Sequence, residues 1–429
     1  MYNLFVKINN KIIGVISIMK ISDKRLQELY SESVISRHRY ENAEKKFKSF
    51  FGYSDYEFFS APGRTEIIGN HTDHNGGKVI ASSISLDTIA VATPNYSDEI
   101  CIISEGYDEQ IVVSVNKDYK DIDKSGTFAL IAGMVDAIKE FGYNVSGFSA
   151  YVTSDVIAAA GVSSSASFEM LICSIVNTFF NDGKISYIDY ARIGQRAENK
   201  YWNKASGMMD QLACAIGGMI ELDFEREVKY ESIPFSFQDF GYSMVVINSE
   251  SNHAMMSDEY SLIPFEMYSI AGKMGVEKLV ELPEKKFWNG INLCTTDEAI
   301  SDRAILRAIH FYNENKRVSE MSQAMKVRDL EKILNLLKES GDSSWKYLQN
   351  CYEPGNAVNQ NVALNLAVTE HVNRELKGAC RVHGGGFSGV ILEILPTSRL
   401  EDYVSYMGNI VGQENIYILS IRKVGAIHV

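Results

Sequence analysis

A polar segment at residues 61–77 carries the groups best suited to chemistry. It reads Ala-Pro-Gly-Arg-Thr-Glu-Ile-Ile-Gly-Asn-His-Thr-Asp-His-Asn-Gly-Gly. A polar stretch broken by glycines is poor core material, and its amide, carboxylate and imidazole groups can hydrogen-bond a polyhydroxylated ligand from several directions. Since His71, Asp73 and His74 are also metal-ligand types, a metal site is the competing interpretation, although their spacing shows no supporting third-ligand pattern.

A second segment, residues 154–167, reads Ser-Asp-Val-Ile-Ala-Ala-Ala-Gly-Val-Ser-Ser-Ser-Ala-Ser and joins an expected strand to an apolar helix. Serines at a helix start can cap the free N–H groups of the first turn. The same N–H groups and the helix dipole attract an anion such as phosphate, and a hydroxyl at this place can ligate Mg²⁺. The residues fit both a plain N-cap and a phosphate loop.

A third segment, residues 383–389, reads His-Gly-Gly-Gly-Phe-Ser-Gly and formally contains G-x-G-x-x-G. The dinucleotide interpretation fails on context, because the segment precedes an expected strand at 390–395 instead of opening a helix. A tight glycine loop that lets the backbone approach a ligand or another domain fits better. The sequence has neither G-x-x-x-x-G-K-[ST] nor H-R-D, so P-loop kinases and protein kinases are excluded.

Taken in this order, the three segments resemble the signatures of the galactokinase branch of the GHMP kinases (galactokinase, homoserine, mevalonate and phosphomevalonate kinases). The pattern A-P-G-R-x-x-x-I-G-x-H-T-D-x-N-G-G is specific to that branch, and Glu198 lies 12 residues before Asp210, as in galactokinases. The resemblance covers about residues 55 to 395. It implies an α+β, two-lobed fold with a ribosomal-S5-domain-2-like N-terminal lobe, a ferredoxin-like C-terminal lobe and the active site in the cleft.

The resemblance also implies an activity, an ATP-dependent sugar-1-kinase that phosphorylates galactose at its anomeric hydroxyl. Asp210 would act as general base or orient that hydroxyl, and Arg64 would neutralise the transferring phosphoryl charge and keep Asp210 ionised. The other implied roles are substrate binding by Asn70, His71, Asp73, Gly207 and Tyr260, ATP and phosphate binding by Gly161, Ser163, Ser164, Ser165, Gly385 and Gly386, and Mg²⁺ ligation by Ser165 and Glu198.

The chain departs from the galactokinase pattern at residues expected to face the sugar. Asn70 stands where galactokinases carry a Glu that meets the C6 side of galactose, and His74 replaces a Tyr. A Glu would repel a C6 carboxylate, whereas an amide can donate to it. Galacturonate is therefore the alternative substrate, and other galactose-like sugars remain open.

An alternative of another class is a sensor that binds ATP and sugar without turnover. The phosphate loop lacks the first glycine of the family pattern, which is compatible with such a role. The retained chemical residues Arg64, Ser165, Glu198 and Asp210 argue against it.

Composition sets the wider limits. The 429 residues carry a formal charge of −13, so a general nucleic-acid or membrane-surface binder is not expected. No run of 18 apolar residues occurs, and six scattered cysteines do not form a disulfide framework, which favours the cytoplasm. Residues 1–20 fit a β-hairpin or an over-extended start better than a signal peptide. We expect small-molecule partners only, sugar and ATP, and a monomer or weak homodimer.

Hydrophobic periodicity predicts the elements that position these segments. Strands are expected at 57–61, 79–92, 100–104, 110–115, 148–156, 217–224, 242–248, 380–382, 390–395 and 416–421. Helices are expected at 22–51, 127–141, 166–180, 185–202, 208–215 and through most of 257–375. We predict an N-terminal extension over 1–20, an N-terminal domain over 21–235 and a C-terminal domain over 236–429.

Overall fold

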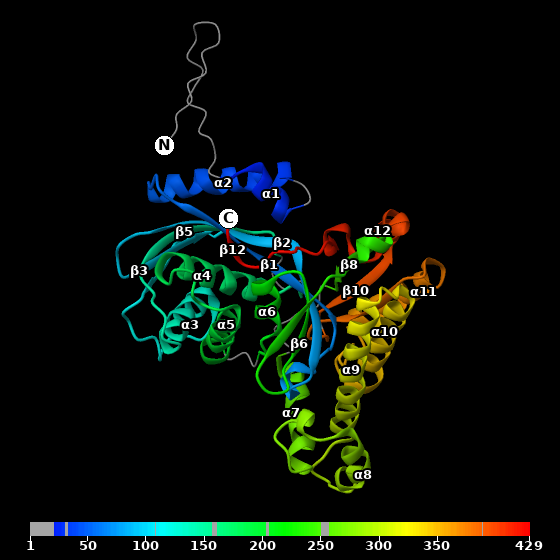
Figure 1. The fold of residues 1–429 in the computed structure, drawn as a ribbon. Helices are drawn as coiled ribbons and strands as arrows, with labels where there is room; N and C mark the ends of the chain where they lie inside the picture. The colour runs from blue at the N-terminus through cyan, green and yellow to red at the C-terminus, as the bar shows by residue number, and fades with distance from the viewer. Residues whose placement is uncertain are drawn as a thin grey trace, which may run out of the picture.

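The fold is known from a computed structural model, which describes residues 21–30, 33–107, 109–156, 161–202, 206–249, 257–387 and 389–429. Two sheets organise these residues into two lobes (Figure 1). Residues 1–20, for which a hairpin or an over-extended start is predicted, lie outside the described residues.

The first sheet has, within the described residues, eight strands in the order β12-β1-β2-β5-β3-β4, with β6 paired to β2 and β7 to β6. Its strands are β1 (Glu57–Ile68), β2 (Lys78–Pro94), β3 (Glu99–Ser104), β4 (Ile111–Ser114), β5 (Phe148–Ser154), β6 (Met219–Asp223), β7 (Lys229–Ile233) and β12 (Ile427–His428). Neighbouring strands are antiparallel except β3 and β5, which are parallel.

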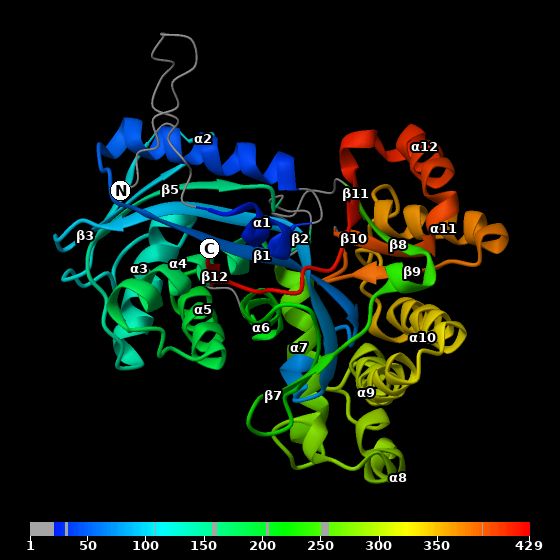
Figure 2. The ribbon, with the colours of Figure 1, turned by 45° about the horizontal axis from the view of Figure 1, so that its top comes forward.

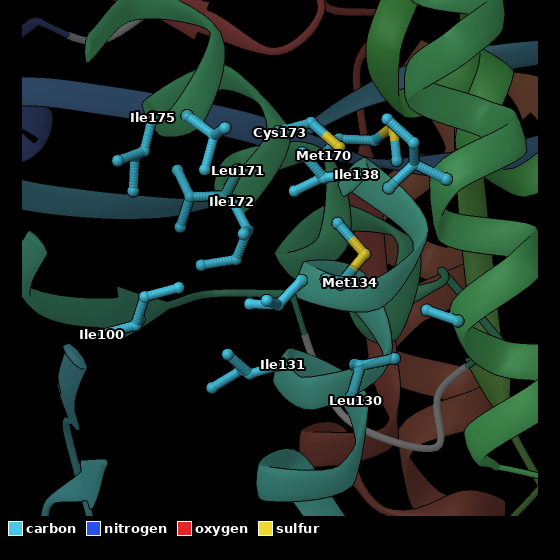
Figure 3. Close-up of a cluster of buried hydrophobic side chains, with 14 of the residues drawn as sticks. Ile100, Leu130, Ile131, Met134, Ile138, Met170, Leu171, Ile172, Cys173 and Ile175 are labelled. Carbon is cyan, nitrogen blue, oxygen red and sulfur yellow. The ribbon is translucent and has the colours of Figure 1, made fainter. Parts of the chain in front are cut away.

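Helices cover both faces of this sheet (Figures 1 and 2). On one face lie α1 (Asp23–Leu29) and α2 (Ser33–Phe51), and on the other α3 (Gly126–Glu140), α4 (Ser164–Phe180), α5 (Tyr187–Tyr201) and α6 (Met209–Ile216). Figure 3 shows the core that α3 and α4 share, where Met134 and Met170 pack with isoleucines and with Cys173. This apolar layer fixes α4, whose first turn carries the serine-rich segment.

The second sheet has the order β11-β8-β10-β9, all antiparallel. Its strands are β8 (Tyr242–Asn248), β9 (Ala379–His383), β10 (Val390–Pro396) and β11 (Ile416–Leu419). The helices of this lobe are α7 (Ser257–Lys273), α8 (Glu284–Thr295), α9 (Asp302–Lys326), α10 (Leu330–Ser343), α11 (Asn361–Leu376) and α12 (Leu400–Val411). Residues of α10 pack on one face of the sheet and residues of α11 and α12 on the other.

The two sheets share one hydrophobic core cluster at their junction. Ile67, Ile68 and Ile80 of the first sheet lie in the same cluster as Val246 and Leu392 of the second. This shared core places the end of β1, and the polar segment that follows it, directly against the second lobe.

Most predicted helices and strands are confirmed. The predicted end of the first strand at residue 61 is wrong, because β1 continues to Ile68 through two register shifts. The sequence analysis did not predict β7, α12 or β12. The boundary at 235/236 stays a prediction; it lies between β7 and β8, while β12 returns to pair with β1.

All six cysteines are free thiols, and Cys173 and Cys214 are core residues. Among the described residues, no helix is both long and apolar enough to cross a membrane.

Candidate active site

A pocket lies where the two lobes meet, and segments far apart in the sequence line it. The lining residues are Arg64, Glu66, Asn70, His71, Asp73, His74, Ser206, Gly207, Met209, Asp210, Tyr260, Gly384 and Gly385. Eight of the residues predicted for the site are among them, from the polar segment, the start of α6, α7 and the glycine loop.

Strand β1 positions Arg64 in the pocket. The register against β2 shifts between Pro62 and Arg64 and again between Glu66 and Ile68, so the strand bends twice within a few residues. The Arg64 amide donates to the carbonyl of Val162 at 3.1 Å, which joins β1 to the serine-rich segment. Gly63 permits this approach, since a Cβ there would lie 2.7 Å from the same carbonyl oxygen.

Arg64 and Asp210 form a two-pronged ion pair in the pocket. Arg64 Nε donates to Asp210 Oδ1 at 2.8 Å, and Nη2 donates to Oδ2 at 2.9 Å. Burial acts to lower the pKa of Arg64, but the charge and hydrogen bonds of Asp210 outweigh it and raise that pKa. The remaining Nη1 donates to the carbonyl of Gly161. Such parallel bonds fix the orientation of the carboxylate as well as its charge.

The serine-rich segment contributes to the same pair. Ser163 holds the N-cap position of α4 with a left-handed backbone at φ 60°, yet its side chain makes no capping bond. Its hydroxyl donates instead to Asp210 Oδ2. The plain N-cap interpretation is therefore wrong for Ser163. The helix begins at Ser164, and the Ser163 hydroxyl does not bond to the N–H groups of the first turn.

The two residues predicted to ligate Mg²⁺ lie together. Ser165 Oγ donates to Glu198 Oε1 at 2.9 Å, and Gln211 Nε2 lies 3.3 Å from Glu198 Oε2. Glu198 is completely buried. A hydroxyl beside a carboxylate is a fitting donor set for Mg²⁺, which commonly uses one or two protein oxygens together with substrate phosphates. Within the described part of the chain, no group of three or more His, Cys, Asp and Glu could hold a metal ion alone.

The residues predicted to face the sugar line the same pocket as Arg64 and Asp210. His71 has a left-handed backbone, and its Nε2 lies 3.1 Å from the carbonyl oxygen of Gly385. Burial, with a smaller effect from His74, lowers the pKa of His71 to about 3, so its ring is neutral at physiological pH. The ring of Tyr260 lies edge-on to His71, with centroids 5.2 Å apart. A Cβ on Gly207 would overlap the carboxylate of Asp73.

The alternative metal site of the polar segment is not formed among the described residues. His74 Nε2 lies 3.6 Å from Asp73 Oδ1, and the rings of His71 and His74 lie 5.9 Å apart. His71, Asp73 and His74 therefore line the same pocket without forming a metal-binding cluster.

The glycine loop forms part of the pocket wall, and its predicted contact with ATP stays a prediction. Gly384 and Gly385 line the pocket beside the predicted sugar residues, whereas Gly385 and Gly386 were expected to contact ATP. A Cβ on Gly385 would lie 2.7 Å from the ring of Tyr260, and one on Gly386 would overlap the backbone of Asn350. These glycines permit close packing against the pocket wall.

Three residues that form or support the pocket wall were not predicted from the sequence: Glu66, Asn350 and Arg381. Glu66 lies two residues after Arg64 on β1, and residues i and i+2 share a face of a strand, which is a usable signal. The other two come from distant parts of the chain, so spacing could not have revealed them.

The two lobes, the serine-rich helix start and the Arg64–Asp210 ion pair in the pocket define a small-molecule kinase of the GHMP class. Residues 129–218 match the GHMP kinases N terminal domain, and residues 45–94 match the galactokinase galactose-binding signature. The structure of Methanococcus jannaschii mevalonate kinase has the same fold, with a TM-score of 0.58 and 17% identity over 87% of this chain and 99% of that one.

Galactokinases are more similar. The Lactobacillus helveticus galactokinase is 30% identical over 376 residues, 85% of this chain and 92% of that protein. The Clostridium tetani galactokinase is 28% identical over 85% of this chain and 90% of that protein. The structure of Lactococcus lactis galactokinase complexed with galactose has a TM-score of 0.79 and 24% identity over 91% of this chain and 100% of that one. The chain belongs to the galactokinase family and is a phosphotransferase with an alcohol group as acceptor.

Proposed function

We propose that this protein transfers the γ-phosphoryl group of ATP to the anomeric hydroxyl of galactose, forming galactose 1-phosphate and ADP. The observation that carries the proposal is the ion pair of Arg64 and Asp210, which lies in one pocket with the predicted sugar ligands. The galactokinase relatives support galactose as the acceptor.

Asp210 would accept a hydrogen bond from the attacking hydroxyl and receive its proton. Since Asp210 already accepts from Arg64 and Ser163, its carboxylate is stabilised as an anion and is a weak base. We therefore assign most of the rate enhancement to positioning and to charge stabilisation by Arg64, and less to early proton removal. This division suits phosphoryl transfer, in which little covalent work falls to the protein.

The phosphates of ATP would lie at the start of α4, where free N–H groups and the helix dipole favour an anion. Gly161, Ser163, Ser164 and Ser165 form this part of the proposed site. Ser165 and Glu198 would hold Mg²⁺, which supplies positive charge that offsets the negative charge of the phosphoryl oxygens. Burial of Glu198 keeps its carboxylate directed at Ser165.

The sugar would be held by His71, Asp73 and Tyr260, with Gly207 leaving room for Asp73. The neutral His71 ring carries its proton on Nε2, toward the Gly385 carbonyl, so Nδ1 is the acceptor available to a hydroxyl. A cytoplasmic location and a monomeric or weakly dimeric state remain part of this proposal.

The test is an ADP-release assay with ATP and Mg²⁺ across galactose, galacturonate, N-acetylgalactosamine, glucose and arabinose. We expect galactose to give the highest kcat/KM and phosphorus NMR to place the phosphate on C1. Calorimetry in parallel would measure sugar and ATP binding. Binding of both without sugar-dependent ADP release would replace the kinase with a sensor.

A further inference from the structure

The amide of Asn70 is already occupied inside the protein. Its Nδ2 donates to the carbonyl of Gly384 and lies 3.2 and 3.3 Å from the two carboxylate oxygens of Glu66. Its Oδ1 accepts from Asn350 Nδ2 at 2.7 Å. Because Gly384 and Glu66 present only acceptors, the orientation of the amide is forced. Asn70 cannot donate to a substrate carboxylate without losing one of these bonds, which removes the physical basis for galacturonate as substrate.

The carboxylate absent at position 70 is present four residues earlier. Glu66 lines the pocket and is 2% exposed. It lies on the same face of β1 as Arg64, about 6.6 Å farther along the strand at roughly 3.3 Å per residue. With the reacting end of the sugar at Arg64, as proposed above, Glu66 would face the end of the ring opposite the hydroxyl that is phosphorylated.

The second lobe fixes this carboxylate in place. Arg381 of β9 donates from Nη2 to Glu66 Oε1 at 2.7 Å and from Nη1 to the carbonyl of Ile67 at 2.7 Å. Arg381 is 1% exposed, so the pair is held away from water. A carboxylate has about four acceptor sites, and Arg381 and Asn70 leave some of those on Glu66 for a further donor.

From this geometry, and resting on the proposed function, we propose that Glu66 determines sugar specificity. Its carboxylate accepts a hydrogen bond from a neutral hydroxyl at the distal end of the sugar and rejects a uronate carboxylate at that position. Asn70 and Arg381 act as positioning residues. The substrate class is therefore a neutral hexose, and a charged sugar acid is excluded by repulsion inside a buried site.

The first test needs no variant. Kinetics of the wild-type enzyme with galactose, 4-deoxygalactose, 6-deoxygalactose and galacturonate would show which hydroxyl is used. Removing the contacted hydroxyl leaves Glu66 without its donor, and we expect kcat/KM for that deoxy sugar to fall by about 30- to 150-fold. The kcat/KM for galacturonate should lie below that for galactose by at least the same factor. Equal efficiency with both deoxy sugars and galactose, or efficient use of galacturonate, would overturn the proposal.

Glu66→Gln then tests the charge. We expect kcat/KM for galactose to fall by about tenfold, because a charged hydrogen bond becomes a neutral one. For the deoxy sugar that lacks the contacted hydroxyl, kcat/KM should change by less than about twofold. The ratio of kcat/KM for galacturonate to that for galactose should rise. Because Glu66→Gln leaves Arg381 without its anion and can unfold the protein, Glu66→Asp is the second variant. Glu66→Asp keeps the negative charge but holds it farther from the sugar, because its side chain is one methylene shorter. We expect kcat/KM for galactose to fall about tenfold and galacturonate to remain a poor substrate.

Glu266→Gln is the matched control. Glu266 is also a buried carboxylate bound to arginines, Arg303 and Arg307, but it lies outside the pocket. We expect it to lower stability without altering the ratio of galactose to galacturonate efficiency.

Calorimetric titration of galactose and galacturonate separates this inference from the proposed function. Galactose binding with galacturonate rejection, in a wild type without turnover, would remove the kinase function and keep the role of Glu66. If the wild type turns over galactose but Glu66→Gln lowers kcat/KM equally for every sugar, the kinase function would stand and the role of Glu66 in specificity would fall.

Discussion

Replacing Asp210 by Asn is the sharpest test of the chemistry. The substitution keeps the shape of the side chain and removes its charge. In the structure that carboxylate accepts two bonds from Arg64, at 2.8 and 2.9 Å, and one from the Ser163 hydroxyl. An Asn can accept on one atom only, so its amide nitrogen would face one of these donors.

Two magnitudes follow. Loss of a general base or orienting carboxylate costs turnover about 10²- to 10⁴-fold, and we expect kcat to fall within that range. Breaking one side of a buried ion pair costs about 3–5 kcal/mol. Asp210 has 27% of its side chain exposed, so the lower figure, about 3 kcal/mol, applies to the free energy of unfolding. The KM for galactose should change by less than about threefold, since His71, Asp73 and Tyr260 supply the other proposed sugar contacts.

The assay is steady-state kinetics at saturating ATP and Mg²⁺, corrected for the folded fraction by urea unfolding. Asp87→Asn is the control, because Asp87 is a fully buried carboxylate bound to Arg39 and Arg422 and lies outside the pocket. It should lose at least as much stability while kcat per folded molecule is retained. A folded Asp210→Asn enzyme with kcat within threefold of wild type would remove Asp210 from the mechanism.

Three further predictions concern the pocket, the metal and pH. Gly207→Ala should raise the galactose KM by about tenfold or more, because the new methyl displaces the Asp73 carboxylate; an unchanged KM in a folded variant would contradict this placement. Ser165→Ala should raise the Mg²⁺ concentration needed for half-maximal rate severalfold, measured by Mg²⁺ titration, and an unchanged requirement would assign the cation elsewhere. Burial lowers the pKa of His71 to about 3 and of His310 to about 4. Between pH 6.5 and 5 the unfolded chain binds these protons and the folded protein does not, so each residue should reduce the free energy of unfolding by up to about 1.36 kcal/mol per pH unit of acidification. Urea midpoints at pH 7 and 5 check this, and equal midpoints would refute it.

Local pattern was enough to predict most of the fold. Alternation and helical spacing are properties of short windows, and they identified the helix that carries Asp210 and the helix that follows Ser163. The first strand was ended too early because Pro62 and Gly63 are typical of turns. In the structure they lie in a strand at a register shift, where a missing N–H and a missing side chain are tolerated.

The wall around Asn70 could not be predicted in the same way. Of its partners, Glu66 is only four residues away, but Asn350 and Gly384, and the Arg381 that binds Glu66, belong to the second lobe, some 280 to 315 residues away in sequence. Considered alone, Asn70 therefore predicted an amide that is available to the substrate. In the structure the side chain is buried and bound to three partners, one of which is Glu66.

The placement of Arg381 links specificity to the docking of the two lobes. Its guanidinium belongs to the second sheet, yet both of its arms bind the strand that carries Glu66 and Arg64. The shared apolar core beneath, with Ile67 and Leu392, holds the two sheets together. A substitution that weakens the packing between the two sheets would displace Glu66 before it displaces Asp210, because Arg64 and Ser163 hold Asp210 within the first lobe. Discrimination between sugars is therefore the first property that such a variant should lose, and phosphoryl transfer the second.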